Sequence, residues 1–318
     1  MDMFSRGAVK WAAMGFLAVI GTFWALSAIF PRPVAVGMMA ALRMSAGLEA
    51  KSVVTRVGEV AYLEGGEGPT IVLLHGIYAR KEHWIDLTRE LTDRYHVIAP
   101  DLPGFGDNPV LGDGAYSYAH QADRLVQFLD AMKVDDFHLA GNSMGGQLTG
   151  MLARRLPDRV RSIAFIGSAA RVASPLRSDM ERALSQGHAP LVVKTEDDFH
   201  ARMDWLFPHA PYIPGPVTAV WAADEAGRAE ANKRIWQEVG ASSSPRLDAL
   251  APSLTQPALI IWCREDRVFH FSGAAVLSHL LPNDELVELS DCGHVPMLDK
   301  PQESGRTYRD FLDRLQPN

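Results

Sequence analysis

The sequence predicts an α/β fold with a mostly parallel, eight-stranded sheet and helices on both of its faces. Short apolar runs bounded by turn residues alternate with longer helix-prone segments over residues 52–166 and again over 258–315. This alternation is typical of βαβ units, whose crossover helices cover a parallel sheet. Apolar residues make up 47% and charged residues 22% of the chain, which suits one large buried core and an additional apolar segment.

Each element follows from its own pattern. The expected strands are residues 52–57, 60–64, 70–74, 96–99, 137–140, 162–166, 258–262 and 285–289. The expected helices are residues 81–92, 118–132, 145–155, 273–281 and 302–315. The core is therefore expected to comprise residues 52–170 and 252–318.

The alternation stops between the strands at 162–166 and 258–262, which predicts an insertion. We expect residues 171–251 to form a helical cap (lid) over the carboxyl ends of the strands, where sites of such folds lie. Its apolar underside would form an acyl-binding pocket, with Trp205, Phe207, Tyr212 and Trp221 as candidate substrate-binding residues. The alternative is a packing layer that does not touch the substrate.

One turn carries a clear chemical signature. Gly141-Asn142-Ser143-Met144-Gly145 joins an apolar strand to a helix-prone run. Gly-x-Ser-x-Gly in this context is a nucleophile elbow, in which glycines tolerate the crowding on both sides of an exposed serine. The N–H of Met144 would face an oxyanion at the helix N-terminus. The alternative is that Ser143 serves only as a helix N-cap.

An upstream loop is expected to complete this oxyanion hole. The strand at 70–74 runs into His75-Gly76-Ile77, where the N–H of Ile77 would be the second donor. His75 precedes the nucleophile in the chain, so we interpret it as a support of the loop and not as a base. Gly76 would have the same supporting role.

Two downstream residues complete a catalytic triad. Asp266 follows the strand at 258–262, and His294 follows the strand at 285–289. His294 would take the serine proton and later protonate the leaving group, while Asp266 would orient the imidazole. Glu265 is the alternative acid. The order Ser, Asp, His differs from the order in trypsin-like and subtilisin-like enzymes.

With these motifs the chain, from about residue 53 to 315, resembles the α/β-hydrolase superfamily. Asp101-Leu102-Pro103-Gly104-Phe105-Gly106 and Gly-Asn-Ser-Met-Gly-Gly-Gln match family motifs. More narrowly, the chain resembles membrane-anchored monoacylglycerol lipases and a bacterial inner-membrane phospholipase A of the same build. The segments that carry this likeness are Ser143 to Gln147, Leu259 to Trp262, Ser272 to Ala274 and Asp291 to His294.

The resemblance implies a serine ester hydrolase that acts on monoacylglycerols, lysophospholipids or phospholipids through an acyl-enzyme. Carbon–carbon bond hydrolases also carry Gly-Asn-Ser-Met-Gly-Gly, so hydrolysis of a soluble diketone is the second hypothesis. A membrane anchor argues against it, because a soluble substrate gains nothing from membrane proximity. The third hypothesis is a non-catalytic ligand-binding or accessory protein on the same scaffold, which a complete triad disfavours.

The N-terminus is expected to tether the enzyme. Trp11 to Phe30 contains no charged residue, and such a helix would span the hydrocarbon core, roughly 30 Å thick. We therefore expect a membrane anchor at residues 1–33, with a cleaved signal peptide as the alternative, and a juxtamembrane helix at 34–51. The flanking charges favour a catalytic domain on the outer, periplasmic face of the inner membrane.

Further expectations concern partners and cofactors. Small residues at Ala18, Gly21, Thr22 and Ala25 share one helical face, which would allow a homodimer through the transmembrane helix; the alternative is a helix that faces lipid without a partner. The net charge of −7 gives no reason to expect nucleic acid as a partner. No zinc-type spacing or phosphate-binding loop is present, so we expect no metal and no cofactor.

The two cysteines leave an alternative open. Cys263 ends the strand before Asp266, and Cys292 lies two residues before His294. Neighbouring strands would bring them close enough for a disulfide. The preferred expectation is nevertheless two buried free thiols that pack as small apolar residues.

Overall fold

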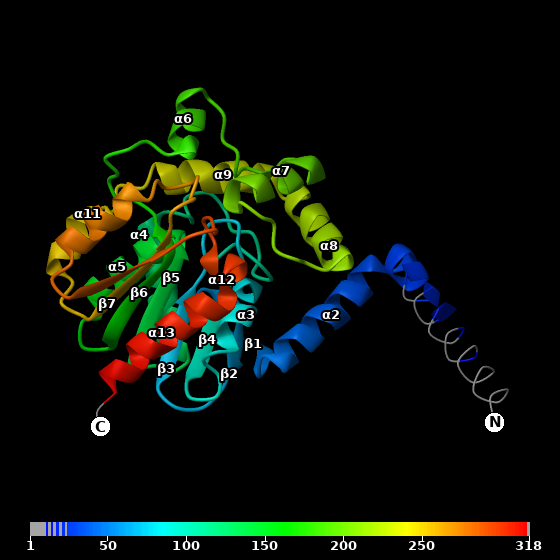
Figure 1. Ribbon diagram of the computed structural model, residues 1–318, viewed down its shortest axis with the longest axis horizontal. Coiled ribbons are helices and arrows are strands. Elements are labelled where there is room, and N and C mark those ends of the chain that lie inside the picture. Colours follow the sequence, from blue (N-terminus) through cyan, green and yellow to red (C-terminus); the bar gives the residue numbers. More distant parts are fainter. Residues whose placement is uncertain (1–10, 12–13, 15–16, 19–20, 23, 317–318) are drawn as a thin grey trace, which may run out of the picture.

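A computed structural model describes residues 11, 14, 17–18, 21–22 and 24–316 of the chain. Eight strands form one sheet in the order β1-β2-β4-β3-β5-β6-β7-β8, which confirms the predicted α/β-hydrolase fold (Figure 1). The first two strands pair antiparallel, β2 pairs antiparallel with β4, and every other pairing is parallel. The strands are β1 Leu48–Thr55, β2 Gly58–Gly65, β3 Thr70–Leu74, β4 His96–Pro100, β5 Phe137–Ser143, β6 Val160–Ala169, β7 Ala258–Cys263 and β8 Asp284–Leu289.

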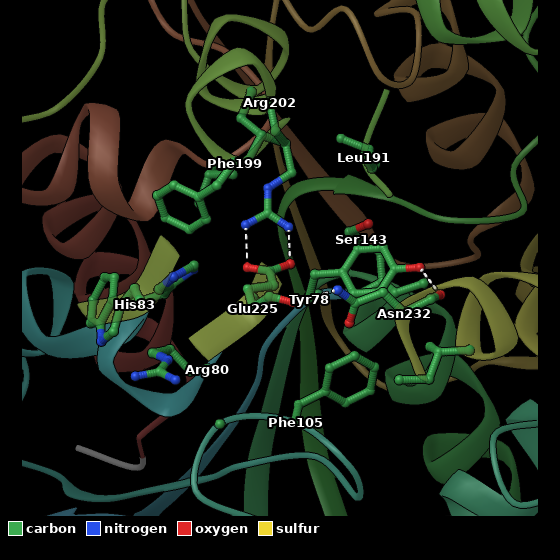
Figure 2. A pocket seen from close by; sticks show the side chains of 18 of the residues that line it. Tyr78, Arg80, His83, Phe105, Ser143, Leu191, Phe199, Arg202, Glu225 and Asn232 are labelled. Atoms are coloured by element: carbon green, nitrogen blue, oxygen red, sulfur yellow. Dashed lines mark hydrogen bonds and ion pairs between the residues drawn. The ribbon is translucent and has the colours of Figure 1, made fainter. Parts of the chain in front are cut away.

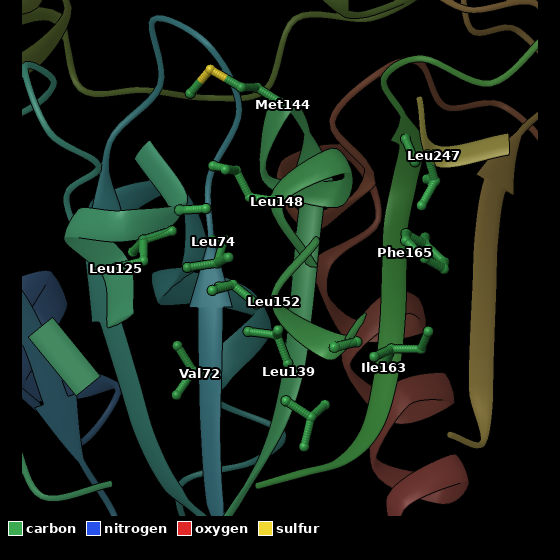
Figure 3. Packing of buried hydrophobic residues seen from close by; sticks show 14 of the residues in the cluster. Val72, Leu74, Leu125, Leu139, Met144, Leu148, Leu152, Ile163, Phe165 and Leu247 are labelled. Atoms are coloured by element: carbon green, nitrogen blue, oxygen red, sulfur yellow. The ribbon is translucent and has the colours of Figure 1, made fainter. Parts of the chain in front are cut away.

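Both faces of the sheet are covered because its central strands are apolar on both sides. In β3, Val72 and Leu74 face a cluster with helices α4 (Tyr118–Ala131), α5 (Met144–Arg155) and α11 (Ser272–Leu280), part of which Figure 3 shows. Ile71 and Leu73 face the opposite cluster, with α3 (Ile85–Thr88), α12 (Pro296–Asp299) and α13 (Pro301–Leu315).

The helix expected at residues 81–92 is shorter than predicted. Residues Lys81–Trp84 form a 3-10 turn, and only Ile85–Thr88 are α-helical. The Thr88 hydroxyl donates to the Ile85 carbonyl at 2.7 Å, so a side chain satisfies a backbone acceptor of this short helix.

The segment between β6 and β7 is helical, as the missing alternation predicted. It contains α6 (Asp179–Ser185), α7 (Glu196–Leu206), α8 (Gly215–Ala226), α9 (Ala229–Gly240), α10 (Leu247–Leu250) and a 3-10 turn, Ala251–Ser253. Capping boxes at Ser178 and Thr195 fix the starts of α6 and α7. Helices α6 to α9 lie together beyond the end of β5 (Figure 1).

Helix α2 (Pro31–Ser45) precedes the sheet in the chain and packs onto the same domain. Its residues Ala35 and Met39 are buried in the cluster that contains α13, and Arg32 pairs with Asp224 of α8. The expected juxtamembrane helix at 34–51 is wrong in its extent. The helix ends at Ser45, and β1 already begins at Leu48 after a turn at Gly47 whose φ is +70°.

The expected membrane span, Trp11 to Phe30, lies partly outside the described residues. Within the part of the chain that the structure describes, no helix combines the length and hydropathy needed to cross a membrane.

Candidate active site

Ser143 stands on a strained turn between β5 and α5. Its φ is +54° and its ψ is −116°, in a region that non-glycine residues rarely occupy. The turn can form only because its glycines lack a side chain. A Cβ on Gly141 would lie 2.3 Å from the Gly145 carbonyl oxygen, and a Cβ on Gly145 would lie 2.1 Å from the carbonyl oxygen of Leu74. This is the geometry of a nucleophile elbow.

Both predicted oxyanion positions lie beside this serine. Met144 is the first residue of α5, where N–H groups have no acceptor within the helix. Ile77 lines the same pocket as Ser143, in the loop after β3. A Cβ on Gly76 would lie 3.1 Å from the Ser143 Cβ, so this loop runs directly against the serine.

His75 is built into the loop and is not available as a base. Its Nε2 accepts the Leu102 N–H at 2.8 Å, and its Nδ1 lies 2.7 Å from the Gly76 carbonyl oxygen. Nδ1 therefore carries the proton. Complete burial lowers the pKa of His75 to about 3, so the ring is neutral and holds the loop in place.

Asp266 and His294 meet below the elbow. The His294 Nδ1 lies 3.0 Å from Asp266 Oδ2, and both side chains are buried. The exposed residue Glu265 does not share this position. The second oxygen of Asp266 accepts the N–H groups of Val268 at 2.8 Å and Phe269 at 3.1 Å. Both carboxylate oxygens are thus satisfied without water.

Ser168, at the end of β6, is a third partner that the sequence analysis missed. Its hydroxyl donates to Asp266 Oδ2 at 2.5 Å, and its oxygen lies 2.8 Å from His294 Nδ1. The residue is fully buried. The Nδ1 proton of His294 is therefore shared between a carboxylate oxygen and a hydroxyl oxygen. In the sequence, Ser168 could have been found from its position at the carboxyl end of β6, the strand between β5 and β7.

Asn142 ties the histidine loop to the elbow. Its Nδ2 donates to the carbonyl oxygens of Ile166 and His294, both at 3.0 Å. Ser143 and His294 line the same pocket. Both are described residues, and no hydrogen bond joins them in this structure. In structures without substrate, such catalytic hydrogen bonds are often long.

The cysteines correct the preferred expectation of free thiols. Cys263 and Cys292 form a disulfide, with their Cα atoms 5.5 Å apart. The reason is the register of the last two strands: Cys263 pairs with Leu289 at the end of β8, and the following loop returns Cys292 to it. Both sulfurs are buried. The bond joins the loop that carries Asp266 to the loop that carries His294.

The predicted aromatic residues divide into two pairs. Phe207 and Trp221 line the pocket with Ser143. Trp205 does not, because it packs against the Arg267 guanidinium, 4.5 Å from ring centroid to Cζ. Tyr212 is 89% exposed and borders a second cavity, between α2 and the 211–214 segment. The second cavity and the main pocket share His83, Ile213, Trp221 and Leu298.

The main pocket has mostly apolar walls and contains a partly buried ion pair. The guanidinium of Arg202 on α7 makes two hydrogen bonds with the carboxylate of Glu225 on α8 (Figure 2). Tyr78 donates its hydroxyl to the Asn232 carbonyl at 2.6 Å, which connects the loop after β3 to α9. The apolar lining residues include Leu191, Phe199, Met203, Leu206, Phe207, Trp221, Ile235 and Leu298.

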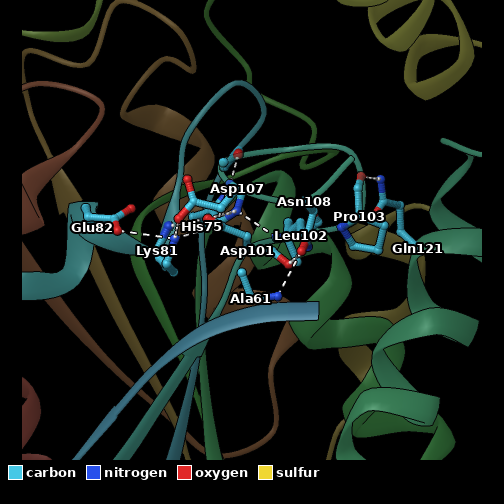
Figure 4. A network of polar contacts seen from close by, with 12 residues as sticks. Ala61, His75, Lys81, Glu82, Asp101, Leu102, Pro103, Asp107, Asn108 and Gln121 are labelled. Carbon is cyan, nitrogen blue, oxygen red and sulfur yellow. Dashed lines mark hydrogen bonds and ion pairs between the residues drawn. The ribbon is translucent and has the colours of Figure 1, made fainter. Parts of the chain in front are cut away.

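A buried polar network supports the loop after β3 (Figure 4). Lys81 Nζ lies 2.7 Å from Asp101 Oδ2, 2.6 Å from Asp107 Oδ2 and 3.2 Å from Glu82 Oε1. Burial alone would lower the pKa of Lys81, but these carboxylates outweigh it and raise that pKa. Asp101 Oδ1 also accepts the Lys81 N–H at 2.8 Å. The turn that begins at Asp101 therefore anchors the loop that carries Ile77.

Comparison with known proteins agrees with this geometry. The family model described as alpha/beta hydrolase fold matches residues 69–301. The chain belongs to the α/β-hydrolase family. A crystal structure of a membrane phospholipase A, described as a bacterial virulence factor, is 34% identical, covers 97% of this α/β hydrolase and 100% of its own chain, and superposes with a TM-score of 0.88.

Two curated relatives have names of the same class. Lipase 1 of Psychrobacter immobilis is 27% identical over 278 residues, which is 86% of this α/β hydrolase and 87% of the relative. Monoacylglycerol lipase ABHD6 of Homo sapiens is 26% identical over 256 residues, which is 78% and 76% of the two chains.

The first prediction concerns Ser168. Ser168→Ala removes one donor to Asp266 and one acceptor at His294, and we expect kcat to fall about 10- to 100-fold with KM unchanged, since hydrogen bonds to charged groups contribute about 1.5–3 kcal/mol. The His294 Nδ1 proton resonance should move, while the melting temperature changes little. An unchanged resonance together with an unchanged kcat would show that Ser168 has no positioning role.

The second prediction concerns the disulfide. The loop that it closes has a sequence separation of 29, so the chain-entropy model gives a stabilisation of about 3–4 kcal/mol. Thiol titration of unfolded, unreduced protein should find no free thiol. The variant Cys263→Ala with Cys292→Ala should be less stable to urea by about that amount. Two free thiols per chain would contradict the bond.

Proposed function

We propose that this chain hydrolyses carboxylic esters of lipids with Ser143 as nucleophile, His294 as general base and acid, and Asp266 as the residue that orients the imidazole. The observation that carries this proposal is one pocket. It joins Ser143 and His294 to apolar walls contributed by the inserted helices. The names of the relatives, which are lipases and a phospholipase, support the same reaction class.

The reaction would proceed through an acyl-enzyme. The Ser143 oxygen attacks the ester carbonyl carbon as its proton moves to His294 Nε2, and the N–H groups of Ile77 and Met144 hold the negative oxygen. The carbonyl re-forms, the alkoxide leaves, and it takes the proton from His294. Water then repeats the sequence, which releases the fatty acid and restores Ser143. Asp266 keeps Nδ1 protonated throughout.

Lipid esters suit the pocket better than short polar esters. An acyl chain would lie against the apolar residues of α7 and α9. Each Å² of apolar area that this contact removes from water would favour binding by about 25 cal/mol. We infer that residues 171–251 act as a cap over the site and that residues 52–170 and 252–318 form the hydrolase core. Monoacylglycerols, lysophospholipids and phospholipids all fit this description.

We further propose that residues 1–33 tether the enzyme to a membrane, with the catalytic domain on the outer face. The similar phospholipase A is named as a membrane protein, and its match to 97% of this chain supports the tether. The disulfide between Cys263 and Cys292 supports an oxidising compartment. The second cavity continues from the main pocket towards α2, the helix that follows the proposed anchor.

The third prediction tests the nucleophile. Ser143→Ala should reduce ester hydrolysis by about a thousandfold or more and leave the melting temperature nearly unchanged, because it removes the attacking oxygen and little packing. Hydrolysis of a p-nitrophenyl ester is the measurement. Ser185→Ala, an exposed position on α6, is the matched control. Substantial activity in Ser143→Ala would exclude the proposed mechanism.

The same assay identifies the acid. Asp266→Asn should be strongly impaired, because Asp266 contacts His294, whereas Glu265→Gln should behave as wild type. The reverse result would move the acid by one position.

The fourth prediction tests the tether. Deletion of residues 1–30 leaves α2 and the ion pair between Arg32 and Asp224 in place. Activity on a soluble ester should be retained, while activity on lipid in a bilayer should fall by about tenfold or more, because the effective concentration of substrate is lost. Arg32→Ala is the control for disturbance of α2. Equal losses on both substrates would mean that the deleted segment shapes the site.

A further inference from the structure

The polar wall of the main pocket carries more positive than negative charge. Besides Arg202 and Glu225, its charged residues are Arg80, Asp224 and Arg228. Both carboxylates already have a cationic partner. Glu225 pairs with Arg202 inside the pocket, and Asp224 Oδ2 accepts a hydrogen bond from Arg32 of α2 at 3.1 Å. The other two arginines of this wall, Arg80 and Arg228, have no carboxylate partner among the described residues.

The contacts of these two arginines are with groups other than carboxylates. The Arg80 guanidinium lies 4.8 Å from the ring centroid of Trp221, and Arg228 Nη2 donates to the Gly106 carbonyl oxygen at 3.3 Å. Among the described residues, neither guanidinium forms an ion pair. Both residues are half-buried, so each has lost water without gaining an opposite charge.

The two arginines line the main pocket together with Gly106, in the turn that follows β4. Arg228 contacts Gly106, and Arg80 lies near enough to Asp107 to act on it electrostatically. Burial alone would raise the pKa of Asp107, but Lys81 first and then Arg80 hold it below its usual value. Asp107 is not within ion-pair distance of Arg80; its cationic partner is Lys81, whose Nζ lies 2.6 Å from Asp107 Oδ2.

A further polar atom in this pocket lacks a partner. His83 Nδ1 is buried without a hydrogen bond to any described residue, and its ring lies 6.0 Å from that of Trp221, on which Arg80 stacks. In Figure 2, Arg80 and His83 lie together on one side of the ion pair between Arg202 and Glu225. Arg80 and Ile77 lie on the same loop after β3. A group bound at Arg80 would therefore lie near the proposed oxyanion hole.

We propose that Arg80 and Arg228 form a subsite for the phosphate of a glycerophospholipid, so that phosphate-bearing esters are preferred to neutral glycerides. This inference rests on the proposed function. Guanidinium groups bind phosphate oxygens through paired, charge-assisted hydrogen bonds. In a phospholipid, only the glycerol carbons separate the phosphate from the acyl ester. The acyl chain would occupy the apolar wall while the phosphate neutralises the two arginines.

The test compares two matched substrates that are monomeric in solution. Dihexanoylphosphatidylglycerol carries the phosphate and dihexanoylglycerol does not. Used below their aggregation limits, they remove any effect of membrane charge. We expect Arg80→Met combined with Arg228→Met to reduce kcat/KM for the phospholipid at least tenfold, mainly through KM, and to change the glyceride by less than threefold. Arg56→Met, in the exposed turn between β1 and β2, is the matched control.

The lysine variants separate binding from packing. Arg80→Lys with Arg228→Lys keeps both charges but not the paired hydrogen bonds of the guanidinium groups, so it should recover part of the preference for the phospholipid. Equal losses on both substrates in the methionine variant, with no recovery by lysine, would overturn the proposal in favour of a structural role for these arginines. Unchanged selectivity in the folded methionine variant would also overturn it.

A second arm uses inorganic phosphate as the probe. Phosphate should compete with dihexanoylphosphatidylglycerol in the wild type and not in the methionine variant. Inhibition by phosphate without any preference for the phospholipid would indicate a site for the free ion, and it would overturn the substrate proposal. If the wild type hydrolyses neither substrate, the proposed function itself fails. If it hydrolyses both with unchanged selectivity in the variants, only the phosphate subsite fails.

Discussion

The contact between the first turn of α5 and the end of β3 determines where every other part of the site lies. Gly145 touches the carbonyl oxygen of Leu74 so closely that even a methyl group would not fit. This contact forces Ser143 to a positive φ and directs it away from the sheet. It also brings Gly76 against Ser143, so that the loop that carries Ile77 lies beside the serine in the same pocket. The strain of about 1–3 kcal/mol is offset by the packing of α5 on the sheet.

Around this turn, the buried charges of Asp266 and Lys81 are each fixed by several partners. Asp266 accepts hydrogen bonds from Ser168, His294 and two backbone N–H groups. Lys81 is surrounded by three carboxylates. An unpaired buried charge would cost several kcal/mol, so these networks allow few alternative arrangements of the loops. The two arginines that we assign to a phosphate subsite differ from this rule, which is why they point to a ligand.

The sequence predicted those parts of the molecule that depend on local pattern. The eight strands follow from apolar runs, and the elbow follows from two glycines that a close approach requires. Ser168 could not be found in this way, because its partners lie about a hundred residues away along the chain. The disulfide was misjudged, because the return of the loop after β8 is a tertiary feature. Trp205 was aromatic and in the right segment, but only packing shows that it contacts Arg267.

The central claim is that Ser143 is the activated nucleophile of a lipid ester hydrolase. Incubation of the intact protein with a fluorophosphonate that bears a long alkyl chain, followed by peptide mass spectrometry, tests it most directly. We expect one adduct per chain, on the peptide that contains Ser143, and protection by an excess of a lipid ester. An adduct on another serine, or no adduct in folded protein, would contradict the account.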